Sequence, residues 1–253
     1  MMHSDKSRSI LVVPRAKEDL AETLDIFEDL SLKTEGVCLF DVVFERAPDF
    51  FYNHKGDIDL FGCATSKNGV RVLKKWGFPS TFPLFVVGNA SRHLASNLGF
   101  QNIFTSSDST AQGLCKPIQQ FVAQKRLQTG CGIYVHGDMV RFDLKHTVEK
   151  MGCVCVAYKG YKLVSNPKER DRLRTLLRNN PFGVLVLSMR VAKSIAELVV
   201  EQGITLEKTF FFSNSDACAT PLKPLFRERV LCSTSPTLLS VKNLVKKTFG
   251  KYF

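Results

Sequence analysis

Residues 182–200 read FGVLVLSMRVAKSIAELVV and contain the pattern that decides the fold. Residues 184–187 are apolar at every position, which is typical of a parallel β-strand covered on both faces. Ser188 then opens a segment of helical period. A buried strand, a hydroxyl residue and a helix, in this order, form the building block of a parallel α/β sheet.

The same alternation of short apolar runs and helical segments extends along the whole chain. We predict strands at 10–13, 37–45, 58–64, 83–88, 102–105, 132–136, 153–164, 183–188, 208–213 and 229–233. Helices fill most of the gaps, so the pattern predicts an α/β protein. A chain of 253 residues is long enough for two domains with separate cores.

Two types of segment each occur twice along the chain, in the order A, B, A, B. Segment A, which is a strand, a helix and a long second strand, covers 10–46 and again 133–164. Segment B, which is three strand-helix pairs, covers 57–123 and again 182–247. One A and one B make a five-stranded doubly wound sheet. The sequence therefore predicts two similar lobes with the working surface in the cleft between them, and the order alone leaves open which A pairs with which B.

Hydroxyl and amide residues end strands and open helices in both copies of segment B. They are Thr65, Ser66, Asn89 to Ser91 and Ser107 to Ser109 in the first copy, and Ser188, Ser213 to Ser215 and Ser233 to Ser235 in the second. Helix capping accounts for each of these residues taken alone. In open α/β sheets, however, ligands bind beyond the carboxyl ends of the strands, where helix N-termini attract anions.

The charge of the chain favours an anionic partner. Lysine and arginine outnumber the acidic residues by 35 to 24, which gives a net charge of +11. Nucleic acid, phosphate and polycarboxylate ligands all fit this charge. Part of the excess is expected to be solubilising surface, as for Lys242, Lys246, Lys247 and Lys251 on or just beyond a C-terminal amphipathic helix. The eight cysteines are scattered mostly through apolar runs and are interpreted as reduced thiols.

Several kinds of chemistry have no support in the sequence. It has no dinucleotide-binding G-x-G-x-x-G after the first strand, no P-loop and no G-x-S-x-G nucleophile elbow. The histidines and cysteines show no metal-ligand spacing, so no metal is expected. The apolar run at 10–13 is too short for a signal peptide or a membrane span, so we expect a cytoplasmic protein without membrane contact.

Four motifs in the first part of the chain resemble those of one known family. Residues 12–15, VVPR, are similar to the family's strand that ends in an Arg-Pro turn, with the two residues reversed. Residues 65–70, TSKNGV, resemble T-S-x-N-[AG]-V, and residues 87–91, VGNAS, resemble V-G-x-A-T with Ser91 in place of Thr. Residues 134–137, YVHG, resemble an aromatic-Leu-Arg-Gly strand end, with histidine in place of arginine.

The resemblance continues in the second part, so that it spans about 240 residues. Tyr161 follows Gly152 by nine residues, which is the spacing of the family's characteristic tyrosine, and Tyr158 is a rival in the same strand. Ser188 and Ser213 match the hydroxyls that end the next two strands. Residues 236–237, Pro-Thr, match the opening of the last helix. Together, these motifs resemble those of the uroporphyrinogen-III synthase family.

This resemblance implies a fold of two similar doubly wound, flavodoxin-like parallel-sheet domains, one inserted in the other. The first A then pairs with the last B, and the middle B with the second A. Domain 1 is expected at 1–42 plus 167–253, and the inserted domain 2 at 48–160. A two-stranded β linker is expected at 43–47 and 161–166.

The resemblance also implies an activity. Members of the family cyclise the linear tetrapyrrole hydroxymethylbilane to uroporphyrinogen III, with ring D inverted and water lost, and they use no cofactor. The substrate carries eight carboxylates, which suits the net charge of +11. The family further implies a hydro-lyase of haem biosynthesis that is a monomer, with transient contact with the preceding enzyme, hydroxymethylbilane synthase.

Residue roles follow from the matched motifs. Tyr161 is expected to be the catalytic hydrogen-bond donor that assists departure of the substrate's hydroxyl group. Expected substrate-binding residues are Arg15, Thr65, Ser66, Gly88, Ser91, Gly137, Ser188, Ser213 and Thr237. Capping remains the simpler role for each hydroxyl, and packing the simpler role for Tyr161.

Two rival functions stay open at the level of sequence. A two-lobed binding protein for an anionic small molecule fits the same architecture. A nucleic-acid-binding regulator fits the calculated pI of about 9.3, but the chain shows no helix-turn-helix, zinc or RNA-binding signature, so no nucleic-acid partner is expected.

Overall fold

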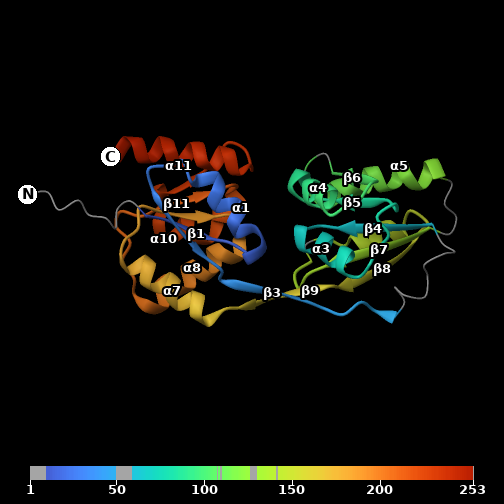
Figure 1. The fold of residues 1–253 in the computed structure, drawn as a ribbon, viewed down its shortest axis with the longest axis horizontal. Coiled ribbons are helices and arrows are strands. Elements are labelled where there is room, and N and C mark those ends of the chain that lie inside the picture. Colours follow the sequence, from blue (N-terminus) through green and yellow to red (C-terminus); the bar gives the residue numbers. More distant parts are fainter. Residues whose placement is uncertain are drawn as a thin grey trace, which may run out of the picture. The chain divides into compact units, whose positions relative to one another are not determined.

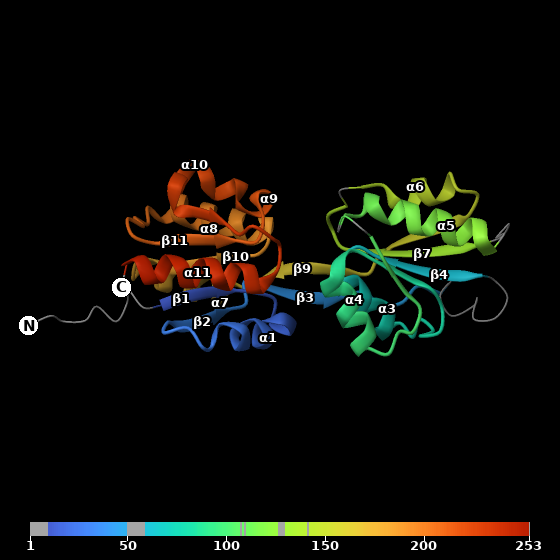
Figure 2. The same ribbon diagram turned by 90° about the horizontal axis from the view of Figure 1, so that it is seen from above.

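The computed structural model describes residues 10–49, 59–106, 108, 110–125, 130–140 and 142–252. The chain divides into two compact units. Unit 1 consists of Met1–Asp41 and Val164–Phe253, and unit 2 is the continuous stretch Val42–Leu163. Each unit contains one five-stranded parallel sheet with helices on both faces (Figures 1 and 2).

The sheet of unit 1 has the order β12-β11-β10-β1-β2, and every neighbouring pair is parallel. Its strands are β1 (Ile10–Pro14), β2 (Lys33–Val37), β10 (Gly183–Val186), β11 (Phe210–Ser213) and β12 (Val230–Cys232). Its longer helices are α1 (Lys17–Phe27), α7 (Pro167–Arg178), α8 (Met189–Gln202) and α11 (Leu238–Tyr252). Short turns α9 (Asp216–Ala219), η3 (Thr220–Leu222), α10 (Lys223–Phe226) and η4 (Arg227–Arg229) precede β12.

The core of unit 1 lies on both faces of this sheet. Helices α7 and α8 pack on one face through buried residues such as Leu173 and Ile195. Helices α1 and α11 pack on the other face, where Phe27 and Val245 are buried (Figure 1). The central strands are covered on both sides, which explains why β10 is apolar throughout.

The sheet of unit 2 has the order β6-β5-β4-β7-β8 and is also parallel throughout. Its strands are β4 (Leu60–Ala64), β5 (Leu84–Val86), β6 (Ile103–Thr105), β7 (Cys131–His136) and β8 (Val154–Lys159). Its helices are α3 (Lys67–Lys75), α4 (Gly88–Asn97), η2 (Gln112–Leu114), α5 (Cys115–Lys125) and α6 (Leu144–Glu149). Helices α3 and α4 cover one face and α5 and α6 the other (Figure 2).

The two sheets are built alike if unit 2 is read from its last strand pair. The order β8-β7-β4-β5-β6 then corresponds, strand by strand, to β2-β1-β10-β11-β12 in unit 1. Each sheet thus combines one segment A, which supplies two strands, with one segment B, which supplies three. Numbered along the chain, the sheet of unit 1 has the order 2-1-3-4-5, which flavodoxin-like sheets share, and the sheet of unit 2 has the order 3-2-1-4-5.

The long second strands predicted at 37–45 and 153–164 are wrong, because each is two strands in the structure. The first prediction spans the end of β2, the non-strand residues Cys38 and Leu39, and β3 (Phe40–Phe44). The second is divided at Gly160 into β8 and β9 (Tyr161–Ser165). β3 and β9 pair with each other in a separate two-stranded sheet (Figure 1).

Candidate functional site

The carboxyl ends of β4, β7 and β8 bring three loops of unit 2 together. Ala64 of β4 pairs with Val135 of β7, and the next residue of β7, His136, pairs with Lys159 of β8. Because neighbouring parallel strands end at the same edge, the loops that follow them start side by side. The register therefore places 65–66, 137 and 160–161 next to one another.

Tyr161 and Ser66 are in direct contact at this edge. The Tyr161 hydroxyl lies 2.8 Å from Ser66 Oγ, although the two residues are 95 positions apart in sequence. Ser66 is the N-cap of α3, and its Oγ accepts a hydrogen bond from the Gly69 N–H at 3.1 Å. Both residues are half-buried, so the pair is anchored on the protein side and reachable from solvent.

Gly137 makes room for the Tyr161 ring. A Cβ atom at position 137 would lie 2.7 Å from Tyr161 Cζ and 2.9 Å from its hydroxyl oxygen. Real side chains do not approach this closely, so only glycine permits the observed position of the phenol. The structure thus brings three of the predicted residues, Tyr161, Ser66 and Gly137, into one cluster.

A second tyrosine, Tyr134, contacts Thr65 at the same edge of the sheet. The hydroxyls of Tyr134 and Thr65 lie 3.5 Å apart. Tyr134 has only 3% of its surface exposed, and burial raises its pKa. Tyr134 was not among the residues predicted to form the site. The available signal was its position in the strand-end motif 134–137.

His136 is the last residue of β7, two positions after this tyrosine. Its Nδ1 is 2.7 Å from the carbonyl oxygen of Gly137, and its ring centroid is 5.2 Å from that of Tyr134. A carbonyl oxygen only accepts hydrogen bonds, so this contact assigns the proton to Nδ1.

Tyr158, the rival of Tyr161, has a different environment. Its ring packs edge-on against Trp76, with the centroids 6.0 Å apart. Trp76 in turn donates a hydrogen bond from Nε1 to the carbonyl oxygen of Glu45 at 3.0 Å. Burial raises the pKa of Tyr158, and its ring packs against the hydrophobic core of unit 2.

The first turn of α4 holds Gly88 and Ser91 at the end of the neighbouring strand β5. Gly88 has a φ of +73°, a conformation that favours glycine. Ser91 is 4% exposed. The N-cap residue of α4, Val87, makes no side-chain capping bond. Ser106, which follows β6, has a buried Oγ without a hydrogen-bond partner among the described residues.

The predicted site residues of unit 1 form contacts within the sheet and helices of that unit. Ser188 caps α8, and its Oγ accepts from the Val191 N–H at 3.2 Å. Ser213 is fully buried, and its hydroxyl donates toward the carbonyl oxygens of Val186, at 2.8 Å, and Ser215, at 2.9 Å. The Ser213 side chain therefore holds the turn after β11 together.

Arg15 and Thr237 also have partners within unit 1. Arg15 lies 3.7 Å from the Asp19 carboxylate and donates from Nε to Thr23 Oγ1 at 3.3 Å. Thr237 is exposed just before α11, and its hydroxyl oxygen accepts from the Ser240 N–H at 3.2 Å. Ser107 and Ser109, noted at a strand end, lie outside the described residues.

A pocket of about 440 Å³ lies at the opposite edge of the unit 2 sheet. It is lined by residues at the amino ends of the strands and by α5, among them Leu60, Phe82, Phe104 and Phe121. The hydroxyl and glycine residues described above lie at the carboxyl edge, so this pocket is separate from them.

Metal sites and membrane spans are both absent from the described part of the chain. It holds no group of three or more His, Cys, Asp or Glu side chains placed to bind a metal ion. None of the helices in the described ranges is both long and apolar enough to span a bilayer.

Comparison with known proteins identifies one family. A family model described as uroporphyrinogen-III synthase HemD matches residues 57–241, which is most of the chain. No curated protein matches the sequence at a significant level.

Solved structures agree with this match at the level of the fold. A mutant uroporphyrinogen III synthase from Thermus thermophilus is 15% identical, with a TM-score of 0.58 over 96% of this chain and 99% of its own. The uroporphyrinogen-III synthetase of Helicobacter pylori is 12% identical, with a TM-score of 0.60 over 95% of this chain and 99% of its own. The prediction of an α/β protein with parallel sheets is confirmed.

Proposed function

The chain belongs to the uroporphyrinogen-III synthase HemD family, and we propose that Tyr161 and the residues around it form its active site. It is an enzyme of tetrapyrrole biosynthesis, a hydro-lyase that cyclises hydroxymethylbilane to uroporphyrinogen III with inversion of ring D. No finding favours the alternative of a binding protein. The hydrogen bond between Tyr161 and Ser66 is the observation that carries the choice of site.

In the first step, Tyr161 donates a hydrogen bond to the hydroxyl of the terminal hydroxymethyl group. The carbon–oxygen bond breaks, both electrons go to the oxygen, and the phenol proton leaves with it as water. The pyrrole nitrogen stabilises the resulting azafulvenium cation. General acids of this kind contribute about 10²–10⁴-fold to a rate.

The cation is then attacked by the substituted carbon of ring D, which gives a spiro intermediate. This intermediate fragments and closes again with ring D inverted. Loss of one proton restores the aromatic pyrrole, and the phenolate of Tyr161 takes that proton back. The product and one water molecule together contain all the atoms of the substrate. The residues around Tyr161 must keep the chain folded for this route, because closure without the enzyme gives the uninverted isomer.

Carboxylates of the substrate bind at helix N-termini of the same edge. Thr65 and Ser66 open α3, and Gly88 and Ser91 open α4, where no side chain caps the helix. Free N–H groups and the positive end of the helix dipole favour a carboxylate there. Gly137 contributes by leaving room for the phenol ring, and its backbone groups belong to the same binding edge.

In unit 1, we assign carboxylate binding to the residues at the equivalent edge of its own sheet. Ser188 opens α8, Thr237 precedes α11, and Arg15 follows β1. The fully buried hydroxyl of Ser213 bonds to carbonyl oxygens, so we assign its turn to binding through the backbone only. The arginine can pair with a carboxylate by exchanging its contact with Asp19.

We extend the proposal to the organisation of the protein. Residues 1–42 plus 167–253 and residues 48–160 are two domains, joined by linker strands at 43–47 and 161–166. The paired strands β3 and β9 support this division. The protein is a cytoplasmic monomer that contacts hydroxymethylbilane synthase briefly, since free hydroxymethylbilane closes spontaneously to the wrong isomer.

The test of the function is an isomer analysis. Enzymatically generated hydroxymethylbilane is incubated with the protein, and the oxidised products are separated. We expect isomer III to dominate with the protein and isomer I without it. If isomer I alone forms in both reactions, the chain lacks the synthase activity.

A further inference from the structure

The hydroxyl of Ser66 is the centre of a short chain of hydrogen bonds. It accepts from the Gly69 N–H at 3.1 Å and lies 2.8 Å from the Tyr161 hydroxyl. A serine hydroxyl has one hydrogen and two lone pairs. One lone pair is used by Gly69, so the contact with Tyr161 uses either the serine hydrogen or the second lone pair.

The position of Ser66 favours the serine as the donor. A hydroxyl that accepts one hydrogen bond becomes a stronger donor for the next, because each bond polarises its neighbour. Ser66 also stands at the positive end of α3, where the helix dipole favours negative charge on the serine oxygen and so makes its hydroxyl a better donor. The chain then runs in one direction, from the Gly69 N–H to Ser66 and from Ser66 to the oxygen of Tyr161.

We propose that Ser66 is a positioning residue, which donates its hydrogen to the Tyr161 oxygen and thereby directs the phenol hydrogen to the leaving hydroxyl of the substrate. The inference rests on the proposed function of Tyr161. Ser66 therefore acts through the tyrosine, and its hydroxyl does not need to bind a carboxylate itself. When the phenol gives up its proton, the same bond stabilises the phenolate.

The contact with Gly137 further restricts the position of the phenol. The Tyr161 ring is bounded on one side by the glycine, where a Cβ atom would lie 2.7 Å from Cζ. On the other side, the Ser66 hydroxyl is held by its capping bond. Gly137 and Ser66 therefore place uncharged groups beside the phenol, and neither of them titrates near neutral pH.

The experiment measures kcat and KM for isomer III formation in S66A, S66G and S66T. We expect S66A to lower kcat by about tenfold, with KM changed less than about twofold, because the donor is misdirected and binding is kept. S66T retains a hydroxyl and a helix cap and should recover most of the loss. S66G also removes the hydroxyl, but glycine is a good N-cap. This variant therefore tests the loss of the hydroxyl even if S66A folds poorly.

A double-mutant comparison separates action through Tyr161 from independent action. If Ser66 acts through the phenol, S66A added to Y161F lowers kcat no further. An equal loss in both backgrounds overturns the proposal, as does a rise in KM at unchanged kcat in S66A. The wild-type reaction reports on the function separately, because failure to form isomer III there refutes the synthase activity itself.

A cap variant in the same unit is the matched control. Asp143 caps α6 and accepts from the His146 N–H at 3.0 Å, as Ser66 caps α3, but it lies outside the proposed active site. D143A should lower the unfolding temperature and leave kcat unchanged. If D143A loses as much kcat as S66A, the effect comes from a weakened fold and the positioning role is wrong.

Discussion

Tyr161 owes its position to two glycines. At Gly160, a Cβ atom would lie 2.5 Å from Val135 Cγ1 and 2.7 Å from Val72 Cγ1, so the backbone passes close to the core of unit 2. At Gly137, a Cβ atom would meet the phenol ring itself. The chain therefore turns from β8 into β9 against the sheet edge, and the tyrosine hydroxyl reaches Ser66.

Replacement of Tyr161 by phenylalanine is the first prediction at this scale. Y161F removes the hydroxyl and keeps the ring, so we expect kcat to fall by about 100-fold with a small change in KM. Y158F is the control, because Tyr158 packs against Trp76 and should retain wild-type turnover. Steady-state assays of isomer III formation compare the two, and equal turnover in Y161F and wild type would remove this residue from the mechanism.

Substitution of Gly137 by alanine should displace the phenol. The added methyl group cannot fit at 2.7 Å from Tyr161 Cζ, so we expect G137A to lower kcat by about tenfold or more. Gly250 provides the control, because a Cβ atom there meets no atom within 4 Å. G250A should keep full activity, and full activity in G137A as well would contradict the assigned contact.

Part of this site was predictable from the sequence. The motifs at 65–70 and 134–137 mark the ends of β4 and β7, and these strands pair in parallel, so the structure brings Thr65, Ser66 and Gly137 to one edge. Their roles in substrate binding stay predictions. The bond between Ser66 and Tyr161 was not predictable, since it joins residues 95 positions apart and depends on the turn at Gly160. The structural role of the Ser213 hydroxyl depends on two carbonyl oxygens that no pattern reveals.

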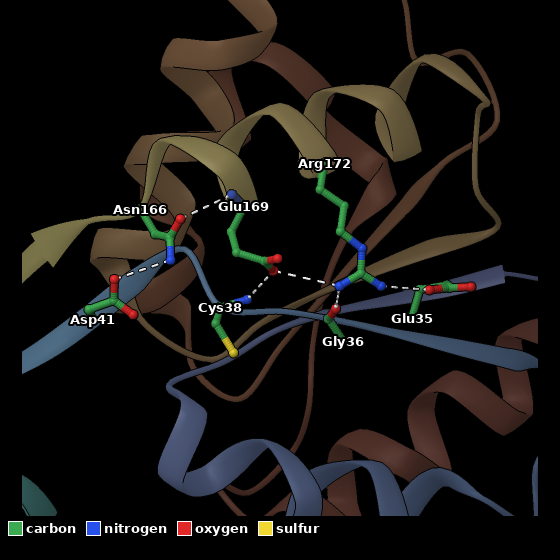
Figure 3. Close-up of polar contacts among 7 residues, drawn as sticks. All are labelled: Glu35, Gly36, Cys38, Asp41, Asn166, Glu169 and Arg172. Carbon is green, nitrogen blue, oxygen red and sulfur yellow. Dashed lines mark hydrogen bonds and ion pairs between the residues drawn. The ribbon is translucent and has the colours of Figure 1, made fainter.

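At the scale of elements, polar contacts fasten α7 to β2 (Figure 3). Glu169 of α7 accepts a hydrogen bond from the Cys38 N–H at 2.9 Å. Arg172 donates to the carbonyl oxygen of Gly36 at 2.7 Å and to the Glu35 carboxylate at 2.9 Å. The N-cap residue Asn166 bonds to Asp41 at 3.1 Å. These contacts join the segment that leads into β3 to the helix that follows β9.

Loss of the Glu169 carboxylate should weaken this junction. E169A leaves the part-buried Cys38 N–H without its acceptor, and an unsatisfied donor costs about 1–2 kcal/mol of unfolding free energy. E169Q keeps an acceptor oxygen and should cost less. D171A is the control, because Asp171 forms an exposed pair with Arg174, and it should cost less than about 0.5 kcal/mol. Urea unfolding measures all three, and equal values for E169A and D171A would refute the prediction.

The element boundaries show where sequence patterns fail. The buried strands β1, β4 and β10 were found because they are apolar on both faces. β2, with the sequence KTEGV, was missed because it lies at the edge of its sheet and has one fully buried residue. An edge strand needs little apolar surface, so its pattern resembles a loop. The predicted strand at 83–88 was too long, because Gly88 already begins α4.

At the scale of the molecule, the net charge of +11 should strengthen binding of a substrate with eight carboxylates. Between about 0.05 and 0.5 M salt, screening shortens the reach of these charges, so we expect KM to rise several-fold at nearly constant kcat. The variant K246Q/K247Q, which neutralises two exposed lysines of α11, should keep the wild-type salt response. A KM independent of salt would show that the excess charge has no part in binding.

Unit 2 is a continuous stretch with its own core, so we expect it to fold independently. Both of its hydrophobic clusters contain residues of Val42–Leu163 only. A fragment of this length should therefore unfold in one cooperative transition. Leu73 is fully buried, so L73A should cost about 2–5 kcal/mol and abolish most of that transition. Calorimetry of the wild-type and L73A fragments tests this expectation. A wild-type fragment without a cooperative transition would show that the two proposed domains fold only together.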